Sequence, residues 1–121
     1  EKTVVCLAGD GCFLMYPQEI ATAAAHGVNL IVVVVNNRMY GTIRMHQERR
    51  YPGRQSGTTI VNPDFVGMAR ACGAWAERVE KTEDFAAAFE RARNAGKPAV
   101  LELLTDPLQI TPAMRVTEMP T

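Results

Sequence analysis

Two long runs of apolar residues without polar alternation dominate the hydrophobic pattern of the chain. The stronger spans residues 29–35 (NLIVVVV), and the other spans residues 3–8, where β-branched residues are frequent. Unbroken apolar runs of this length are typical of strands covered on both faces of a parallel sheet. We therefore predict a buried strand over each run. Shorter apolar runs predict further strands over 74–79 and 99–104.

Helical patterns and loop signals lie between the first strands. Residues 17–25 predict a helix with Pro17 in its first turn and Gly27 just beyond its end. A second helix is predicted over 39–48, although Gly41 weakens it. Proline and glycine then mark a loop over 49–61.

The second half of the chain repeats this alternation. Asn62 and Pro63 are expected to cap a helix, and Thr82 to cap another. Residues from Asp106 onward are interpreted as a tail because they contain several prolines and no periodic pattern. The apolar positions of the first of these helices recur at i, i+3, i+4 and i+7, namely Phe65, Met68, Ala69 and Cys72.

The order of elements places the chain in the α/β class, with a parallel sheet and helices on both faces. We expect one domain over residues 1–112 and a tail over 113–121. The chain enters its first strand almost at once, so we expect a partial domain cut from a longer protein. Ligands of such sheets bind beyond the carboxyl ends of the strands. Residues 9–12 and 36–40 both fall at that edge.

Composition narrows the functional classes. The 121 residues include 13 Lys plus Arg and 13 Asp plus Glu, a balance that gives no sign of nucleic-acid or membrane binding. The short basic stretch around Arg49 and Arg50 is interpreted as a solvated face or an oligomer contact. Three cysteines without CxxC spacing argue against a disulfide framework or a zinc site, and favour the cytoplasm. Cys6 and Cys72 are expected in the core.

The turn Gly9-Asp10-Gly11 raises a chemical question, because an aspartate between glycines should repel phosphate. A dinucleotide-binding fingerprint is not matched, since Leu14 occupies the third glycine position and the next strand ends in Asn36-Asn37 rather than an acid. A P-loop is excluded because no Gly-Lys-Ser/Thr follows. A plain tight turn carrying a surface aspartate remains open.

A cation would reconcile the aspartate with phosphate. Mg²⁺ takes hard oxygen ligands from one or two protein carboxylates together with substrate phosphates. Asp10 can supply one oxygen, and Asn37 can supply an amide oxygen from the neighbouring strand end. We therefore interpret Asp10 as facing a metal ion that in turn faces a diphosphate.

The spacing of these residues resembles a known cofactor motif. Asn37 follows Asp10 by 27 positions, and the match GDGCF…VVVVNNRMYGTIR is similar to the thiamine-diphosphate motif of thiamine-diphosphate-dependent enzymes. The segments NPDF at 62–65 and PAVLE at 98–102 look like acetolactate synthase and its relatives. The resemblance covers residues 3 to about 112, and it implies the diphosphate-binding domain of that family.

The resemblance assigns roles to three groups of residues. It implies Mg²⁺ ligation by Asp10, Asn37 and the carbonyl of Met39. The remaining diphosphate-binding positions would be Gly9, Gly11, Cys12, Tyr40 and Gly41, where Cys12 departs from the commoner Ser or Ala. Positions that line the substrate pocket in related decarboxylases correspond to Thr42, Ile43 and His46, although His46 taken alone suits an exposed helix position.

The resemblance also implies an activity that this chain cannot complete alone. The cofactors would be thiamine diphosphate and Mg²⁺, the substrate a 2-keto acid, and the reaction carboligation after decarboxylation, or decarboxylation alone as in benzoylformate decarboxylase. The glutamate that contacts the aminopyrimidine belongs to a separate pyrimidine-binding domain, so no catalytic residue maps here. We expect the chain to be inactive by itself, and the parent to be a homodimer or homotetramer. A non-catalytic α/β ligand-binding module is the alternative class.

Overall fold

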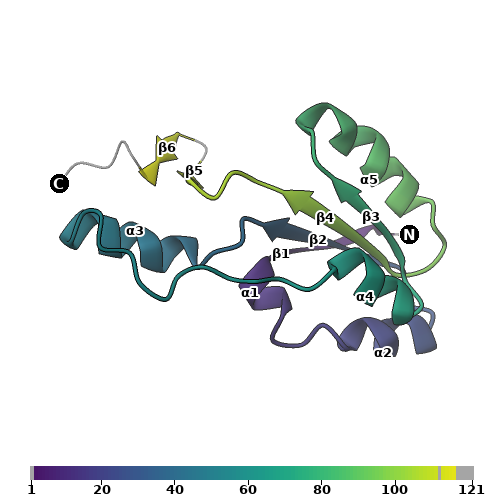
Figure 1. The fold of residues 1–121 in the computed structure, drawn as a ribbon. Helices are drawn as coiled ribbons and strands as arrows, with labels where there is room; N and C mark the ends of the chain where they lie inside the picture. Colours follow the sequence, from purple (N-terminus) through teal and green to yellow (C-terminus); the bar gives the residue numbers. More distant parts are fainter. Residues whose placement is uncertain (1, 112, 117–121) are drawn as a thin grey trace.

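Four parallel strands form the centre of the molecule. A computed structural model describes residues 2–111 and 113–116 of the chain. The strands pair in the order β1-β2-β4-β3, with every pairing parallel (Figure 1). Their bounds are β1 (Val4–Gly9), β2 (Leu30–Asn36), β3 (Trp75–Val79) and β4 (Ala99–Leu104).

Helices cover both faces of this sheet, as predicted. One face packs against α1 (Asp10–Phe13), α2 (Glu19–Ala25) and α4 (Phe65–Ala71), and the other against α5 (Phe85–Arg93). The strand β2 shows why the apolar run has no alternation. Val34 packs with Phe65 on the first face, whereas Val33 packs with Ala88 on the second. In the described part of the chain, no helix is long and apolar enough to cross a membrane.

The prediction that the first strand is buried is wrong. β1 forms where expected, but Val4 and Leu7 are 58% and 72% exposed, and Cys6 is exposed rather than in the core. The reason is that β1 lies at the edge of the sheet, where the helices cover little of it. Cys72 is half-buried and packs against the core, as expected.

A helix and a small hairpin extend beyond the carboxyl ends of the strands. The helix α3 (Gly41–Arg50) has no buried residue and projects away from the sheet (Figure 1). Beside it, β5 (Gln109–Thr111) and β6 (Met114–Arg115) form an antiparallel hairpin where the sequence indicated only a tail. The hairpin has no apolar alternation long enough to be read from sequence. Residues 112 and 117–121 of the predicted tail lie outside the described residues.

Two predicted helix caps are also wrong. The residue before α4 is Asp64, and its side chain makes no capping hydrogen bond, whereas Asn62 lies further upstream and bonds elsewhere. Thr82 begins a 3₁₀ turn, η1 (Thr82–Asp84), which precedes α5. A polar residue before an apolar run caps a helix only when the helix begins directly after that residue. The side chain of Asn62 instead forms hydrogen bonds with residues that are distant in the sequence.

Candidate functional site

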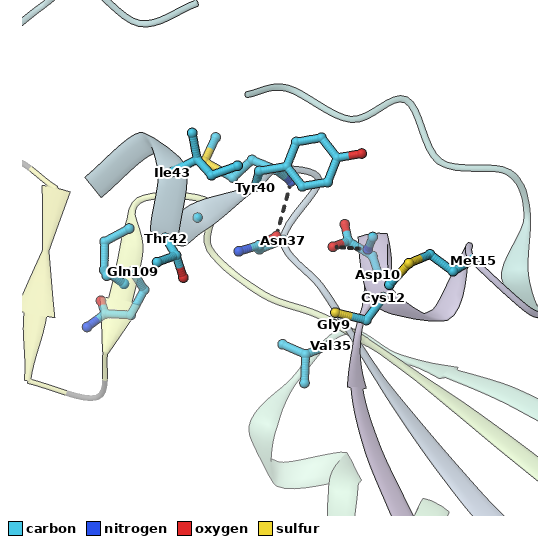
Figure 2. Close-up of a pocket in the computed structure, with 14 residues that line it drawn as sticks. Gly9, Asp10, Cys12, Met15, Val35, Asn37, Tyr40, Thr42, Ile43 and Gln109 are labelled. Carbon is cyan, nitrogen blue, oxygen red and sulfur yellow. Dashed lines mark hydrogen bonds between the residues drawn. The ribbon is translucent and has the colours of Figure 1, made fainter. Parts of the chain in front are cut away.

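The pairing of β1 with β2 brings the two predicted loops together. Gly9 at the end of β1 lies opposite Val35 of β2, so the residues that follow each strand emerge side by side. They enclose a pocket of about 490 Å³ at the carboxyl edge of the sheet (Figure 2). Its lining comprises Gly9, Asp10, Gly11, Cys12, Met15, Val35, Asn37, Met39, Tyr40, Gly41, Thr42, Ile43, Gln109 and Ile110.

This pocket collects all of the predicted site residues except one. Every predicted metal, diphosphate and substrate position lines it apart from His46. His46 is exposed on α3 and lines a neighbouring hollow with Ile43 and Tyr51. Sequence reasoning missed Gln109 and Ile110, because no pattern in the chain predicts that the hairpin returns to the strand ends.

Asp10 is the charged centre of the pocket wall. The residue is only 3% exposed, and its carboxylate accepts three hydrogen bonds. Oδ1 accepts from the N–H of Gly11 at 2.9 Å. Oδ2 accepts from the N–H of Arg38 at 2.8 Å and from Nδ2 of Asn62 at 2.7 Å. Because a carboxylate oxygen has two lone pairs, Oδ2 is saturated and Oδ1 keeps one acceptor position open.

Asn37 and Met39 add two neutral oxygens to the same pocket. The amide Oδ1 of Asn37 accepts from the N–H of Met39 at 3.1 Å, which fixes the side chain in a tight local turn. Arg38 lies between them with a positive φ of 57°, and this conformation allows the chain to turn back toward Asp10. Among residues 2–111 and 113–116, no hydrogen bond forms to the Met39 carbonyl.

Of the backbone N–H groups predicted to bind diphosphate, two already donate hydrogen bonds within the protein and two have no partner within their helix. The N–H of Gly11 donates to Asp10, and that of Tyr40 donates to the carbonyl of Thr58 at 2.8 Å. Cys12 and Gly41 lie in the first turns of α1 and α3, where N–H groups have no partner within the helix. Cys12 and Gly41 are therefore the better donors for an anion in this pocket.

The pocket is narrowed by an aromatic ring that approaches the glycine turn. A Cβ placed on Gly11 would meet Cε1 of Tyr40 at 2.9 Å and Cδ1 of Ile60 at 3.3 Å. At the equivalent position on Gly9, the described part of the chain places no atom within 4 Å. Gly11 therefore permits the close approach of Tyr40, whereas the space beside Gly9 stays open.

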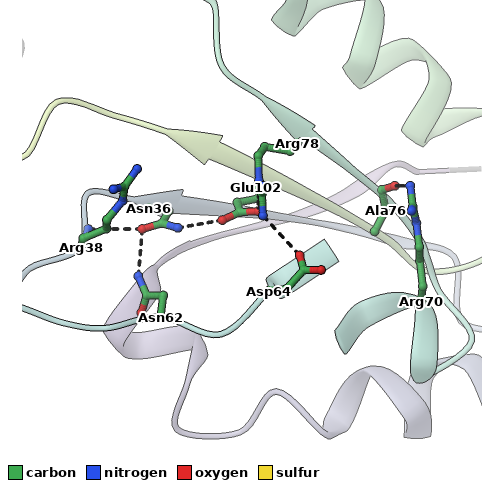
Figure 3. A network of polar contacts seen from close by, with 8 residues as sticks. All are labelled: Asn36, Arg38, Asn62, Asp64, Arg70, Ala76, Arg78 and Glu102. Atoms are coloured by element: carbon green, nitrogen blue, oxygen red, sulfur yellow. Dashed lines mark hydrogen bonds and ion pairs between the residues drawn. The ribbon is translucent and has the colours of Figure 1, made fainter. Parts of the chain in front are cut away.

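A buried polar network supports the pocket from behind (Figure 3). Nδ2 of Asn36 donates to Oε1 of Glu102 at 2.7 Å, and Nε of Arg78 donates to Oε2 of the same carboxylate at 2.8 Å. Nη2 of Arg78 also reaches Oδ1 of Asp64 at 3.2 Å. The hydrogen bond with Glu102 raises the pKa of Arg78 above its usual range, so its guanidinium stays charged. The network joins the ends of β2, β3 and β4.

The β5–β6 hairpin is held in place by Asp106. The N–H of Leu108 donates to Oδ1 of Asp106 at 2.8 Å, and Arg115 forms an ion pair with Oδ2 at 2.7 Å. The hydrogen bond from Leu108, followed by the charge of Arg115, lowers the pKa of Asp106. These contacts of Asp106, which we call the Asp106–Arg115 clamp, hold Gln109 beside Thr42 at the outer wall of the pocket (Figure 2).

The donor set fits a hard cation that shares its ligands with a bound phosphate. Within the described residues, no cluster of three His, Cys, Asp or Glu side chains could hold a metal alone. The pocket instead offers one carboxylate oxygen, one amide oxygen and one backbone carbonyl. Mg²⁺ tolerates such an incomplete protein set because waters and substrate phosphates complete its six ligands.

Comparison with known proteins identifies the family. A family model for the thiamine pyrophosphate enzyme C-terminal TPP binding domain matches residues 1–103. The acetolactate synthase large subunit of Corynebacterium glutamicum is 36% identical over 110 residues, which cover 86% of this chain and 18% of that protein. Acetolactate synthase isozyme 2 large subunit of Escherichia coli is 33% identical over 108 residues, covering 88% and 20%.

Solved structures agree with the sequence relatives in fold. A thiamine diphosphate-dependent 4-hydroxybenzoylformate decarboxylase from Rhodococcus jostii superposes with a TM-score of 0.82 at 27% identity, covering 92% of this chain and 21% of that one. Benzoylformate decarboxylase from Polynucleobacter necessarius gives 0.81 at 26% identity, with the same coverage. The chain spans about a fifth of the length of these relatives. With residues 1–103 matched by the family model, the chain belongs to the C-terminal TPP-binding domains of thiamine pyrophosphate enzymes.

Proposed function

We propose that this chain supplies the Mg²⁺- and diphosphate-binding half of an active site that acts on 2-keto acids with thiamine diphosphate. The observation that carries the proposal is the position of Asp10. Its buried carboxylate keeps one acceptor position open at a pocket that also contains the oxygens of Asn37 and Met39. Buried carboxylates are stabilised by pairing or by metal coordination.

In this proposal, each part of the chain has a distinct task. Asp10, Asn37 and the Met39 carbonyl hold Mg²⁺, and the N–H groups of Cys12 and Gly41 hold the diphosphate. When bound, thiamine diphosphate supplies the electron sink for the carbon that loses CO₂. The protein residues present here fix the position of the cofactor and provide no acid or base for the reaction.

Carboligation of the acetolactate synthase type is the favoured reaction. It is supported by the identity of 36% with an acetolactate synthase large subunit. A decarboxylase of the benzoylformate type is the second candidate, supported by the TM-scores of 0.82 and 0.81. Thr42 and Ile43 form the outer part of the pocket, next to the hairpin, and are proposed to contact the 2-keto acid. Product analysis with pyruvate and benzoylformate would separate a carboligated product from an aldehyde.

The exposed surfaces are consistent with an assembled active site. Val4 and Leu7 on β1, Ile43 on α3 and Tyr51 directly after α3 are large apolar side chains that are about half exposed or more. We propose that these surfaces are covered in the full-length enzyme by a pyrimidine-binding domain and by a second subunit, in a homodimer or homotetramer.

The test is a calorimetric titration of the full-length protein with thiamine diphosphate, with and without Mg²⁺. We expect binding that requires Mg²⁺ and is lost in Asp10→Ala. Asp84→Ala provides a matched control, because Asp84 is exposed at the start of α5 on the opposite face of the sheet. Equal binding by wild type and Asp10→Ala would remove Asp10 as a ligand, and binding of NAD or ATP in place of thiamine diphosphate would favour a different module.

A further inference from the structure

The side-chain amide of Asn62 joins the two strand ends that form the pocket. Its Nδ2 donates to Oδ2 of Asp10 at 2.7 Å and to Oδ1 of Asn36 at 2.8 Å. Asn62 comes from the segment that precedes α4, 52 residues after Asp10 in the sequence. It therefore ties the turn after β1 to the end of β2 without belonging to either loop.

The contact decides which oxygen of Asp10 keeps an open acceptor position. Together, Asn62 and the N–H of Arg38 occupy both lone pairs of Oδ2, whereas among the described residues Oδ1 accepts only from Gly11. Without Asn62, both oxygens would have one open position. The carboxylate could then rotate, and the cation would have to select and fix one orientation on binding.

The orientation of Asn62 is itself fixed by the network behind it. Reversing the amide would place Oδ1 of Asn62 against two acceptors, Oδ2 of Asp10 and Oδ1 of Asn36. Asn36 cannot adapt, because its Nδ2 is held at 2.7 Å by the buried carboxylate of Glu102 (Figure 3). The donor of Asn62 must therefore point toward Asp10.

This arrangement leaves a buried acceptor without a partner. Oδ1 of Asn62 is buried and accepts no hydrogen bond from any residue that the structure describes. An unsatisfied buried acceptor costs about 1–3 kcal/mol. An apolar residue of similar shape would avoid that cost but would lose both hydrogen bonds of Nδ2, and the bond to the Asp10 carboxylate contributes about 1.5–3 kcal/mol. The two contributions are of similar size and opposite sign, so the stability of the fold does not by itself explain an asparagine at this position.

We propose that Asn62 is a positioning residue for Asp10, which orients the carboxylate so that Oδ1 meets the cation. The inference rests on the proposed function, because it assumes that Asp10 binds Mg²⁺. Asn62 touches neither the cation nor the cofactor and acts only through Asp10. Partners in the outer shell of a metal site typically change metal affinity by about 10–100-fold when they are removed.

The test measures the Mg²⁺ dissociation constant of the full-length protein by calorimetry in excess thiamine diphosphate. Asn62→Leu keeps the branching and the number of side-chain heavy atoms and removes the donor, and we expect Mg²⁺ to bind it about 10–100-fold more weakly. Val79→Ala is the control, because it removes core volume on the other face of the sheet and lowers stability away from the pocket. We expect its folded fraction to bind Mg²⁺ with the wild-type dissociation constant.

Each outcome has a definite meaning. If the wild type binds Mg²⁺ and Asn62→Leu binds it equally well, the positioning role is wrong and the proposed function stands. An equal loss of affinity in Val79→Ala would reduce Asn62 to a structural role. Absence of Mg²⁺ binding by the wild type would overturn the proposed function and the inference together. Should Asn62→Leu fail to fold, Asn62→Ser tests the same role, because the shorter serine side chain cannot reach both acceptors. An unchanged Mg²⁺ affinity of Asn62→Ser would also refute the positioning role.

Discussion

Replacing Arg78 with methionine would test whether the network behind the pocket stabilises the fold. Methionine preserves an apolar stem of similar length and removes the guanidinium. Glu102, which is 1% exposed, would then keep only the hydrogen bond from Asn36 among those that the described residues provide. A buried carboxylate deprived of its cationic partner is costly, because the remaining charge is poorly solvated.

The expected loss follows from the contacts of Arg78. A hydrogen bond to a charged group contributes about 1.5–3 kcal/mol, and the bond from Nε to Glu102 is of this kind at 2.8 Å. The contact with Asp64 is exposed and adds about 0–1 kcal/mol. The Arg78 side chain is 41% exposed, so water would replace part of the lost interaction. We therefore expect Arg78→Met to lower the free energy of unfolding by about 2 kcal/mol.

Urea denaturation of the full-length protein, compared with Arg93→Met, measures this loss. Arg93 forms an exposed ion pair with Glu90 on α5, and its replacement should cost less than about 1 kcal/mol. A double-mutant cycle with Glu102→Gln would isolate the coupling between Arg78 and Glu102, since the amide oxygen of glutamine can still accept from Asn36. If Arg78→Met is no more destabilising than Arg93→Met, the buried carboxylate does not depend on Arg78 and the reasoning is refuted.

Three further substitutions test other features of the site and fold. Arg38→Val should have a free energy of unfolding about 1–2 kcal/mol lower than that of Arg38→Gly, because φ at this position is 57°. Equal urea midpoints for the two variants would contradict this. The hydrogen bond from Arg91 lowers the pKa of Glu77 from its usual value of 4.5, so its stabilisation is fully present above that pH and is lost as the pH falls through the lowered pKa. Arg91→Met should therefore lower the urea midpoint of unfolding at about pH 7 and do so progressively less as the pH falls below 4.5, whereas a loss that does not change with pH would contradict this. Gly11→Val should displace the Tyr40 ring and weaken thiamine diphosphate binding in calorimetry, whereas unchanged affinity would show that this approach is not required.

Local sequence patterns were sufficient to predict most of the sheet and the two loops of the pocket. The unbroken run at 29–35 predicts a strand buried on both faces, and β2 is such a strand. The glycines around Asp10 and the asparagines at the end of β2 lie at strand ends, and parallel pairing must bring neighbouring strand ends together. These features depend on residues close in sequence, or on a topology that the alternation of elements already implies.

The features that sequence could not predict depend on distant partners. The exposure of β1 is set by its place at the sheet edge, and its own residues look like those of a buried strand. The partners of Asn62 lie 26 and 52 residues away, so a local pattern suggests only a helix cap. The return of Gln109 to the pocket depends on the Asp106–Arg115 clamp, whose two members do not share a helix or strand.

The two buried carboxylates at this edge of the sheet differ in how their charges are balanced. Glu102 and Asp10 are 1% and 3% exposed, and both accept hydrogen bonds from neutral donors. Only Glu102 has a cationic partner, Arg78; across residues 2–111 and 113–116, no side chain forms an ion pair with Asp10. A buried charge is stabilised by pairing or by metal coordination. In the proposed function, a cation bound with a diphosphate would supply the countercharge for Asp10, a residue that lines the pocket and whose Oδ1 keeps one acceptor position open.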